Sequence, residues 1–338
     1  MTFSLLDLAV PILGAPMAGG PSTPALAAAV SDAGGLGFLA AGYLSAEKFA
    51  EAIAATRSLT SAPIGVNLFV PQPSAATADG LERYRELLAP LAEHYGAEIP
   101  APHPDDDAWQ AKLDVVADTA PEVASFTFGC PTADVLTRLR DRGVLTVVTV
   151  TSLDEAGVAV QAGAGALAVQ GPEAGGHRGT FDPVALPGEE PLDELLAAVV
   201  AAHQLPVIAA GGLSTAADVR RALDGGAAAA QAGTAFLLAD EAGTNAAYRG
   251  ALTDPQFAET VVTRAFSGRY ARGLANEFTV RYGGVAPLGY PEVNQMTGPL
   301  RRAAVAAGDP HGTNLWAGTS WRSITADRAA DIVAALAG

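Results

Sequence analysis

The stretch PVIAAGGLSTAADV, residues 206–219, decides the fold. Its first half is an uninterrupted apolar run, which is typical of a strand buried on both faces of a parallel sheet. Two glycines then turn the chain, and Ser214 precedes a segment in which a helix is expected to begin. A strand followed directly by a helix is the repeating unit of α/β proteins, so the same unit is expected elsewhere in the chain.

Seven further apolar runs are similar to residues 206–212 and are predicted to be strands. Helical segments fill the gaps between them; Pro24 lies in the first turn of one, and Ser45 and Ser152 precede two others. Eight strands that alternate with helices favour a closed (β/α)8 TIM barrel, with a doubly wound open sheet as the alternative. The strands are expected at 11–17, 35–42, 63–70, 123–129, 144–151, 166–171, 206–212 and 228–237.

Two regions fall outside the repeat. Residues 71–120 separate the third and fourth strands and contain proline-rich turns around a helical segment near 79–95, which predicts an insertion at the active face. The residues after the eighth strand form a smaller, mainly helical cap in this interpretation, and the last helix, near 325–336, packs back. The predicted organisation is a barrel over residues 1–240 and cap and packing helices over 241–338.

Composition limits the partners of this chain of 338 residues. The formal net charge of −16 argues against nucleic acid or an anionic membrane surface, because both are themselves negative. Cys130 is the only cysteine, which excludes an intramolecular disulfide, and the N-terminal segment does not resemble a signal peptide. No apolar run reaches the ~20 residues that span a bilayer. A cytoplasmic protein without a metal site that acts on a small molecule is expected, and a homodimer is compatible with the sequence.

The carboxyl ends of the strands, which form the active face of such a barrel, carry amides, hydroxyls and bare backbone. Gly211 and Gly212 run from a strand into a helix whose amino end and free N–H groups can hold a phosphate. Gly233 and Thr234 follow the next strand and complete the phosphate site that is common after the seventh and eighth strands. Ordinary turns would also explain these glycines, but two such sites on adjacent strands favour phosphate.

Asn67 and Gln170 are amide side chains placed among apolar strand residues. A buried amide costs free energy unless it is paired, and each amide can both donate and accept hydrogen bonds. Either one alone is equally well explained as a partner for loop backbone. Together they favour the edge of a heterocycle, and with the phosphate site they predict flavin mononucleotide (FMN) at the mouth of the barrel.

The block EAGGHRG, residues 173–179, places an imidazole between glycines. Gly175 and Gly176 lack a Cβ, so the backbone there can approach a flavin ring and adopt positive φ. His177 is then expected beside the reactive edge of the flavin. An imidazole titrates near neutrality, so it can act there as a base, an acid or a neutral donor.

Seven motifs identify the chain with a known family: PILGAPMAGG (11–20), GVNLF (65–69), FTFGCP (126–131), VQGPEAGGHRG (169–179), LPVIAAGGLSTAADV (205–219), QAGTAFL (231–237) and LWAGTSW (315–321). With them the chain resembles the nitronate monooxygenases, formerly called 2-nitropropane dioxygenases, across nearly all its length. The resemblance implies an FMN-dependent enzyme that oxidises alkyl nitronates, such as propionate 3-nitronate, with O2 to nitrite and a carbonyl compound, as a detoxification. It also implies a catalytic role for His177 and FMN-binding roles for Met17, Asn67, Gln170, Gly175, Gly211, Gly212, Gln231, Gly233 and Thr234.

Three residues are predicted to contact the substrate. Arg178 adds positive potential near an anionic nitronate, although loop carbonyls are an equally good partner for it. Tyr290 is the candidate for the aromatic side chain of the cap that can lie over the flavin in the family. Cys130 stands where a larger apolar side chain is expected, and Thr319 stands where the family often has glutamine. Both departures bear on the identity of the substrate.

Two roles for His177 are open: it holds a nitronate anion as a hydrogen-bond donor, or it removes the α-proton of a neutral nitroalkane as a general base.

The closest rival function is an FMN-dependent enoyl-acyl-carrier-protein reductase that takes hydride from a nicotinamide cofactor. In that group the histidine is typically followed by an aliphatic residue, so Arg178 favours nitronate oxidation. The sequence is also compatible with a non-catalytic FMN carrier or with a flavin-free barrel enzyme for a phosphorylated metabolite.

Overall fold

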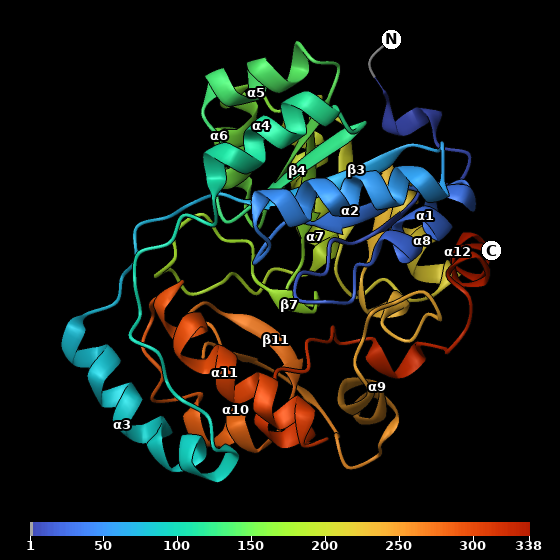
Figure 1. The fold of residues 1–338 in the computed structure, drawn as a ribbon. Helices are drawn as coiled ribbons and strands as arrows, with labels where there is room; N and C mark the ends of the chain where they lie inside the picture. Colours follow the sequence, from blue (N-terminus) through green and yellow to red (C-terminus); the bar gives the residue numbers. More distant parts are fainter. Residues whose placement is uncertain (1–2) are drawn as a thin grey trace.

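The computed structural model describes residues 3–338, and Figure 1 shows a barrel with a smaller region beside its open end. Eight parallel strands follow one another in the order β1-β9-β8-β6-β5-β4-β3-β2. A bridge between Leu13 and Leu36 joins β1 to the start of β2, so the sheet closes. The predicted (β/α)8 barrel is therefore confirmed, with all eight strands at the expected places. They are β1 (Ile12–Gly14), β2 (Gly37–Ala40), β3 (Ile64–Phe69), β4 (Val123–Thr127), β5 (Leu145–Val150), β6 (Ala166–Gln170), β8 (Val207–Ala210) and β9 (Ala229–Ala232).

The strands are apolar on both faces because each packs against two buried layers. Leu13, Val147 and Ile208 belong to one buried cluster, which the strands share among themselves. Their chain neighbours Ile12 and Val148 point the other way, into a second cluster that includes side chains of the surrounding helices. Continuous apolar runs in the sequence are thus the direct signature of this architecture.

Thr23, Ser45 and Ser152 each cap a barrel helix by accepting a hydrogen bond from the N–H three residues later. One expected boundary is wrong by a residue: Thr215, not Ser214, caps the helix after β8, because Asp218 completes a capping box with Thr215. The helices around the barrel are α1 (Pro24–Asp32), α2 (Ala46–Leu59), α4 (Trp109–Thr119), α5 (Ala133–Arg140), α6 (Leu153–Ala162), α7 (Leu192–Ala202), α8 (Ala216–Asp224) and α12 (Ala329–Ala337).

The smaller region combines α3 (Ala78–Tyr95) with the chain that follows β9. Tyr84 and Leu88 of α3 share a buried cluster with Met296 and Leu300 of a later helix. By contrast α4, from the second half of the predicted insertion, packs on α2. None of the helices in residues 3–338 is both long and apolar enough to cross a membrane. The elements of this region after β9 are α9 (Ala246–Thr253), β10 (Thr260–Thr263), β11 (Ala271–Leu274), α10 (Glu277–Tyr282) and α11 (Glu292–Ala306), after which α12 returns to the barrel beside α1 and α8. Residues 3–338 also contain short 3-10 turns at Leu5–Asp7, Thr234–Phe236, Pro310–Gly312 and Trp321–Ser323.

A second sheet joins the two regions, and the sequence did not reveal it. The histidine loop contains a short strand, β7 (Gly176–His177), which pairs with β11, and β11 pairs in turn with β10. His177 lies opposite Ala271 in this antiparallel register. The loop that looks bare in the sequence is therefore clamped by a segment of the cap, as the position of β7 in Figure 1 shows.

Candidate active site

A cavity of about 810 Å³ lies where the carboxyl ends of the barrel strands face the cap. Its size falls in the range of roughly 300–1,000 Å³ that is usual for pockets that bind small molecules and cofactors. The walls come from both regions of the molecule. The lining includes every residue predicted to bind the cofactor, namely Met17, Asn67, Gln170, Gly175, Gly211, Gly212, Gln231, Gly233 and Thr234, and also His177.

One end of the cavity is made of main chain. Gly211 and Gly212 have φ of 120° and 71°, a region that favours glycine. A Cβ at Gly212 would lie 2.9 Å from the Cβ of Glu173, so only glycine fits this turn without displacing its neighbour. The N–H of Gly212 has no hydrogen-bond acceptor among residues 3–338. An anion placed at this turn would therefore meet a free donor at the start of α8.

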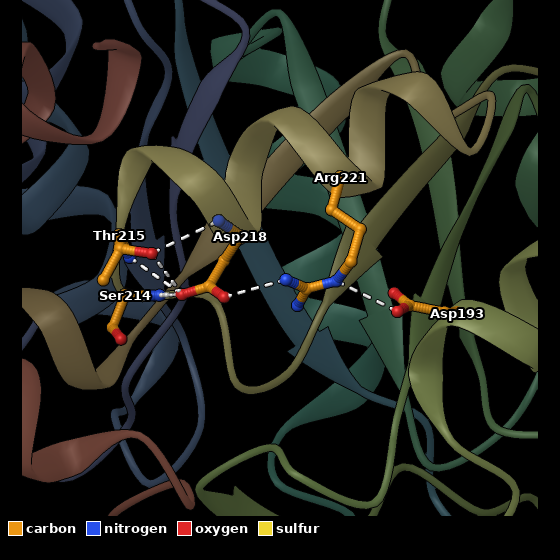
Figure 2. A network of polar contacts seen from close by, with 5 residues as sticks. All are labelled: Asp193, Ser214, Thr215, Asp218 and Arg221. Carbon is orange, nitrogen blue, oxygen red and sulfur yellow. Dashed lines mark hydrogen bonds and ion pairs between the residues drawn. The ribbon is translucent and has the colours of Figure 1, made fainter.

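A network of polar contacts fixes the segment that follows the glycine turn (Figure 2). The Asp218 carboxylate accepts hydrogen bonds from the N–H of Ser214 at 3.2 Å and from the N–H of Thr215 at 3.0 Å. Arg221 then bridges Asp218, at 3.1 Å, and Asp193 of α7, at 2.9 Å. Because Asp218 satisfies these two N–H groups, the donors left for a ligand are those of the glycine turn itself.

The segment that contains the LWAGTSW motif closes this end of the cavity. The N–H of Gly318 donates to Oγ1 of Thr234 at 3.0 Å, and the N–H of Thr319 donates to the carbonyl of Glu173 at 3.0 Å. A Cβ at Gly175 would lie only 2.5 Å from the nitrogen of Gly318, so the two main chains touch directly. Thr319 takes part through its backbone, and its side chain is exposed. The resulting cradle of bare main chain fits the phosphate of a flavin nucleotide.

Asn67 and Met17 lie on the cavity wall with some of their polar groups already used. Nδ2 of Asn67 donates to Ser125 at 2.9 Å and to Thr127 at 3.0 Å, which leaves the Oδ1 acceptor for a ligand. The N–H of Met17 donates to Oγ of Ser22 at 2.8 Å. The contact left to Met17 is that of its side chain.

Gln170 shapes the histidine loop. Its Nε2 donates to the carbonyl of His177 at 3.0 Å, and its Oε1 accepts from the N–H of Gly179 at 2.8 Å. Both ends of the amide therefore serve loop backbone, which was the alternative explanation for this residue. Gln170 still lines the cavity, and it fixes the place where the imidazole stands.

His177 stands among aromatic rings at the junction of barrel and cap. Its ring centroid lies 5.5 Å from that of Phe128, 5.5 Å from that of Trp316 and 6.4 Å from that of Tyr290. Its Nε2 forms a hydrogen bond of 2.7 Å with Oγ of Ser267, a residue of the segment between β10 and β11. The imidazole is thus held from the cap side, while its backbone belongs to the loop after β6.

The imidazole of His177 is neutral at physiological pH. Burial, together with the positive charges of Arg269 and Arg301, lowers the pKa of His177 from 6.5 to about 3. Arg269 is 3% exposed and stacks over the ring of Phe128 at 4.2 Å. His177, Arg301 and the glycine cradle line one cavity, with the buried Arg269 close behind the imidazole, and together they form a site that attracts anions.

A sequence profile of the nitronate monooxygenase family matches residues 3–337. The chain belongs to this family. It is 42% identical to a nitronate monooxygenase of Pseudomonas aeruginosa, over 93% of this chain and 91% of that protein. It is 40% identical to a nitronate monooxygenase of Paraburkholderia phytofirmans, over 98% of this chain and 92% of that protein.

Two solved structures extend the comparison to the fold of the nitronate monooxygenase family. A nitroalkane oxidase from Streptomyces ansochromogenes matches with a TM-score of 0.94 at 45% identity, over 98% of this chain and 96% of that one. FabK from Thermotoga maritima matches with a TM-score of 0.77 at 27% identity, over 98% and 93%. The resemblance inferred from the motifs is confirmed: the chain is an oxidoreductase of a family that uses a flavin and oxidises nitronates.

Two of the residues predicted to contact the substrate, Arg178 and Cys130, do not line the cavity. Arg178 is 2% exposed and lies outside the cavity, because its Nη1 donates to the carbonyl of Gly171 at 2.5 Å and its Nη2 to that of Gly188 at 3.5 Å. Cys130 also lies outside the cavity; its Sγ contacts the carbonyl of Pro131 at 3.3 Å, and burial raises the pKa of the thiol to about 11. Both side chains therefore serve local structure.

Tyr290 lies near the imidazole but on the wall of a second, smaller cavity of about 210 Å³. Tyr43, whose charge state affects that of Tyr290, lines both cavities. Burial raises the pKa of Tyr290 well above 10, so its hydroxyl stays protonated. A contact between Tyr290 and the flavin stays a prediction.

Sequence reasoning missed four residues of the site: Ser267, Arg269, Arg301 and Phe128. Ser267 and Arg269 lie in a loop of the cap with no motif of its own, and Arg301 lies in the middle of α11. Phe128 lies inside the FTFGCP motif, where its φ of 78° marks a strained position for an aromatic residue. Of these residues, only Phe128 lies in a motif that was identified from the sequence.

Proposed function

We propose that this enzyme uses FMN and O2 to oxidise alkyl nitronates, with nitrite and a carbonyl compound as products, and that its role is detoxification. Propionate 3-nitronate is a substrate of the right chemical type. The observation that carries the proposal is the neutral imidazole of His177, bound to Ser267 in a cavity that is also lined by Arg301 and by the main chain of Gly211 and Gly212.

The residues that would hold FMN divide into two groups. The main chain of Gly211, Gly212 and Gly233 and the hydroxyl of Thr234 would surround the phosphate. The ring would contact other parts of the lining, among them the side chains of Asn67 and Gln231, with Gly175 and Met17 next to the cradle and Gln170 behind the histidine loop. Bound FMN supplies the electron acceptor for the substrate and the reaction with O2.

The protonation state of His177 favours a nitronate over a neutral nitroalkane as substrate. General bases work best when their pKa lies near the working pH, and a pKa of about 3 makes His177 a weak base toward a C–H bond. A nitronate has already lost that proton, so it needs a donor and positive charge. Neutral imidazole and the nearby arginines supply both.

Ser267 selects the tautomer that such a donor role requires. Its Oγ lies 2.7 Å from Nε2 of His177, 3.3 Å from the carbonyl of Arg269 and 3.4 Å from the N–H of Arg269. We infer that the hydroxyl proton goes to the shorter contact, while Oγ accepts from the N–H of Arg269. Nε2 is then the acceptor, so the ring proton lies on Nδ1, where it can donate to a nitronate oxygen.

The test is nitrite release from propionate 3-nitronate by the wild type and by His177→Asn, with bound FMN followed by its absorbance. We expect kcat/KM to fall about 100- to 10,000-fold while FMN stays bound, and wild-type turnover of ethyl nitronate to exceed that of nitroethane at pH 7. His94→Asn, an exposed histidine of α3, is the matched control. Equal inactivity of wild type and His177→Asn with FMN bound would contradict the proposal, and rapid bleaching of the flavin by NAD(P)H would favour the reductase function.

A further inference from the structure

One face of α11 forms the wall of the cavity that lies away from the glycine cradle. The residues on this face recur at the spacing of a helix: Asn294, Gln295, Gly298, Arg301, Arg302 and Val305. Gly298 leaves room for the guanidinium groups beside it, since a Cβ there would lie 3.3 Å from Nη1 of Arg302 and 3.8 Å from Nη2 of Arg301. None of the residues assigned to FMN belongs to this polar, cationic face of α11.

Arg301 is the central side chain of this wall, and all of its partners are uncharged. Nη1 donates to Oδ1 of Asn314 at 2.9 Å, and Nη2 donates to Oδ1 of Asn294 at 2.6 Å and to its carbonyl at 3.1 Å. The protein thus supplies acceptors for three of the five N–H groups, and the buried Nε has none. A guanidinium in such surroundings lacks the counter-charge that a buried cation normally has.

The contacts of Arg301 also fix the orientation of both asparagines. A guanidinium can only donate, so the amide atom that faces it must be the oxygen in each case. Neither Nδ2 of Asn294 nor Nδ2 of Asn314 donates a hydrogen bond to another residue in the described part of the chain. We call Arg301, Asn294 and Asn314 the anion subsite. The groups that this subsite has left for a ligand are all hydrogen-bond donors. They match a carboxylate, and not a group that both donates and accepts.

No acidic side chain neutralises this part of the cavity. None of the ion pairs between described residues includes Arg301, Arg302 or Arg269. Arg269, the other cation near His177, bonds only to Thr180 and to the face of Phe128. This is notable in a chain of formal net charge −16, where acidic residues outnumber basic ones. Arg301, which lines the cavity and has only uncharged partners, is therefore available to an anionic ligand.

The anion subsite lies near the imidazole but apart from it. Asn314 stands two residues before Trp316, whose ring contacts that of His177 at 5.5 Å. Arg301 is close enough for its positive charge to contribute to the lowered pKa of His177. Both side chains line the same cavity, so they are available to the two ends of one small molecule.

We propose that Arg301, with Asn294 and Asn314, binds a carboxylate at the far end of the substrate, so that the enzyme selects nitronates that carry a second negative charge. This inference rests on the proposed function, because it assigns the end of the substrate that does not react. Arg301 then determines specificity, while His177 holds the reacting nitronate group.

The first experiment compares two three-carbon substrates, propionate 3-nitronate and propyl 1-nitronate, which differ in the carboxylate. In Arg301→Met we expect the ratio of kcat/KM between them to fall about 10- to 100-fold, through KM for the carboxylate substrate. Arg301→Lys, which keeps the charge, should restore part of the ratio. Arg83→Met, an exposed arginine of α3, should leave the ratio at the wild-type value. An equal loss on both substrates, or no change in the ratio, would overturn the proposal.

The second experiment needs no turnover. Succinate presents two planar anionic groups and butyrate presents one, so we expect succinate to bind the FMN-loaded wild type more tightly, by thermal shift and by flavin difference spectra. Arg301→Met should weaken succinate at least 10-fold relative to butyrate. Asn314→Asp, which gives Arg301 an internal counter-ion, should do the same if Arg301→Met does not fold. Equal binding of the two acids by the wild type would overturn the subsite, whereas failure of both nitronates to react, with selective succinate binding, would overturn only the proposed function.

Discussion

The two ends of the active-site cavity are lined by different kinds of groups, main chain at one end and side chains at the other. At the cofactor end, glycines after β8 and β9 present bare main chain, and no charged side chain lines the cradle formed by Gly211, Gly212, Gly233 and Thr234. At the substrate end, side chains from the cap predominate, among them Ser267 and Arg301. The first end depends on backbone shape, and the second depends on which side chains the cap brings over the barrel.

This difference indicates which part of the site should be shared by the nitronate monooxygenase family and which part can differ between its members. A main-chain cradle tolerates almost no substitution, because a Cβ occupies the space of the ligand or of a neighbouring loop. A helix face such as that of α11 can exchange side chains without changing the backbone. Cofactor identity should therefore be uniform across relatives, while substrate range should follow residues such as Arg301.

The largest expected effect at the cofactor end comes from Gly212→Ala. At φ of 71°, a Cβ would be strained and would lie 2.9 Å from the Cβ of Glu173. We expect the Kd of FMN to rise about 10- to 100-fold, from a strain and overpacking cost of about 1–3 kcal/mol, as measured by quenching of FMN fluorescence. Gly157→Ala is the control, because α6 has open space at that position. Unchanged FMN affinity in Gly212→Ala would show that the turn is not the cofactor site.

The same difference explains what could be predicted from the sequence. Continuous apolar runs gave the eight strands, and glycines at strand ends gave the cradle, because both features depend on a few consecutive residues. The pairing of His177 with Ala271 could not be foreseen, since two-residue β7 has no pattern and its partner is distant in the chain. Ser267 and Arg301 were missed for the same reason.

The sequence was also a poor guide to the hydrogen-bond partners of polar side chains. The sequence identified Gln170 and Arg178 as polar groups near the site, but it could not show which atoms they bind. Both side chains turned out to hold loop carbonyls or N–H groups. A buried polar side chain needs partners, and in a folded loop the nearest partners are usually main-chain groups.

At the substrate end, Ser267→Ala tests whether the cap positions the imidazole. The variant removes the hydrogen bond of 2.7 Å to Nε2 of His177, so the ring loses its fixed tautomer. We expect kcat for a nitronate to fall about 10-fold with FMN binding unchanged, and Ser267→Thr, which keeps the hydroxyl, to recover activity. Loss of activity in both variants alike would indicate a packing role for Ser267 instead of a positioning role.

The smallest predicted effect is the pH dependence of stability, which arises where the two ends meet. In the unfolded chain His177 takes up a proton below pH 6.5, whereas in the folded protein burial, Arg269 and Arg301 hold its pKa at about 3. Between these values the unfolded state binds more protons, so the contribution of His177 makes folding less favourable as the pH falls from 6.5 toward 3.

Removing the imidazole removes this contribution. Between pH 7.5 and pH 5.5 the wild type should lose about 1 kcal/mol more stability than His177→Asn, both measured by thermal unfolding in the same excess of FMN. The difference should grow at lower pH and vanish above pH 7. A pKa near 6.5 in the folded enzyme would make the two unfolding curves parallel at every pH. That result would mean that the imidazole is hydrated and that Arg269 and Arg301 do not act on it, and the anion-attracting end of the cavity would lose its electrostatic basis.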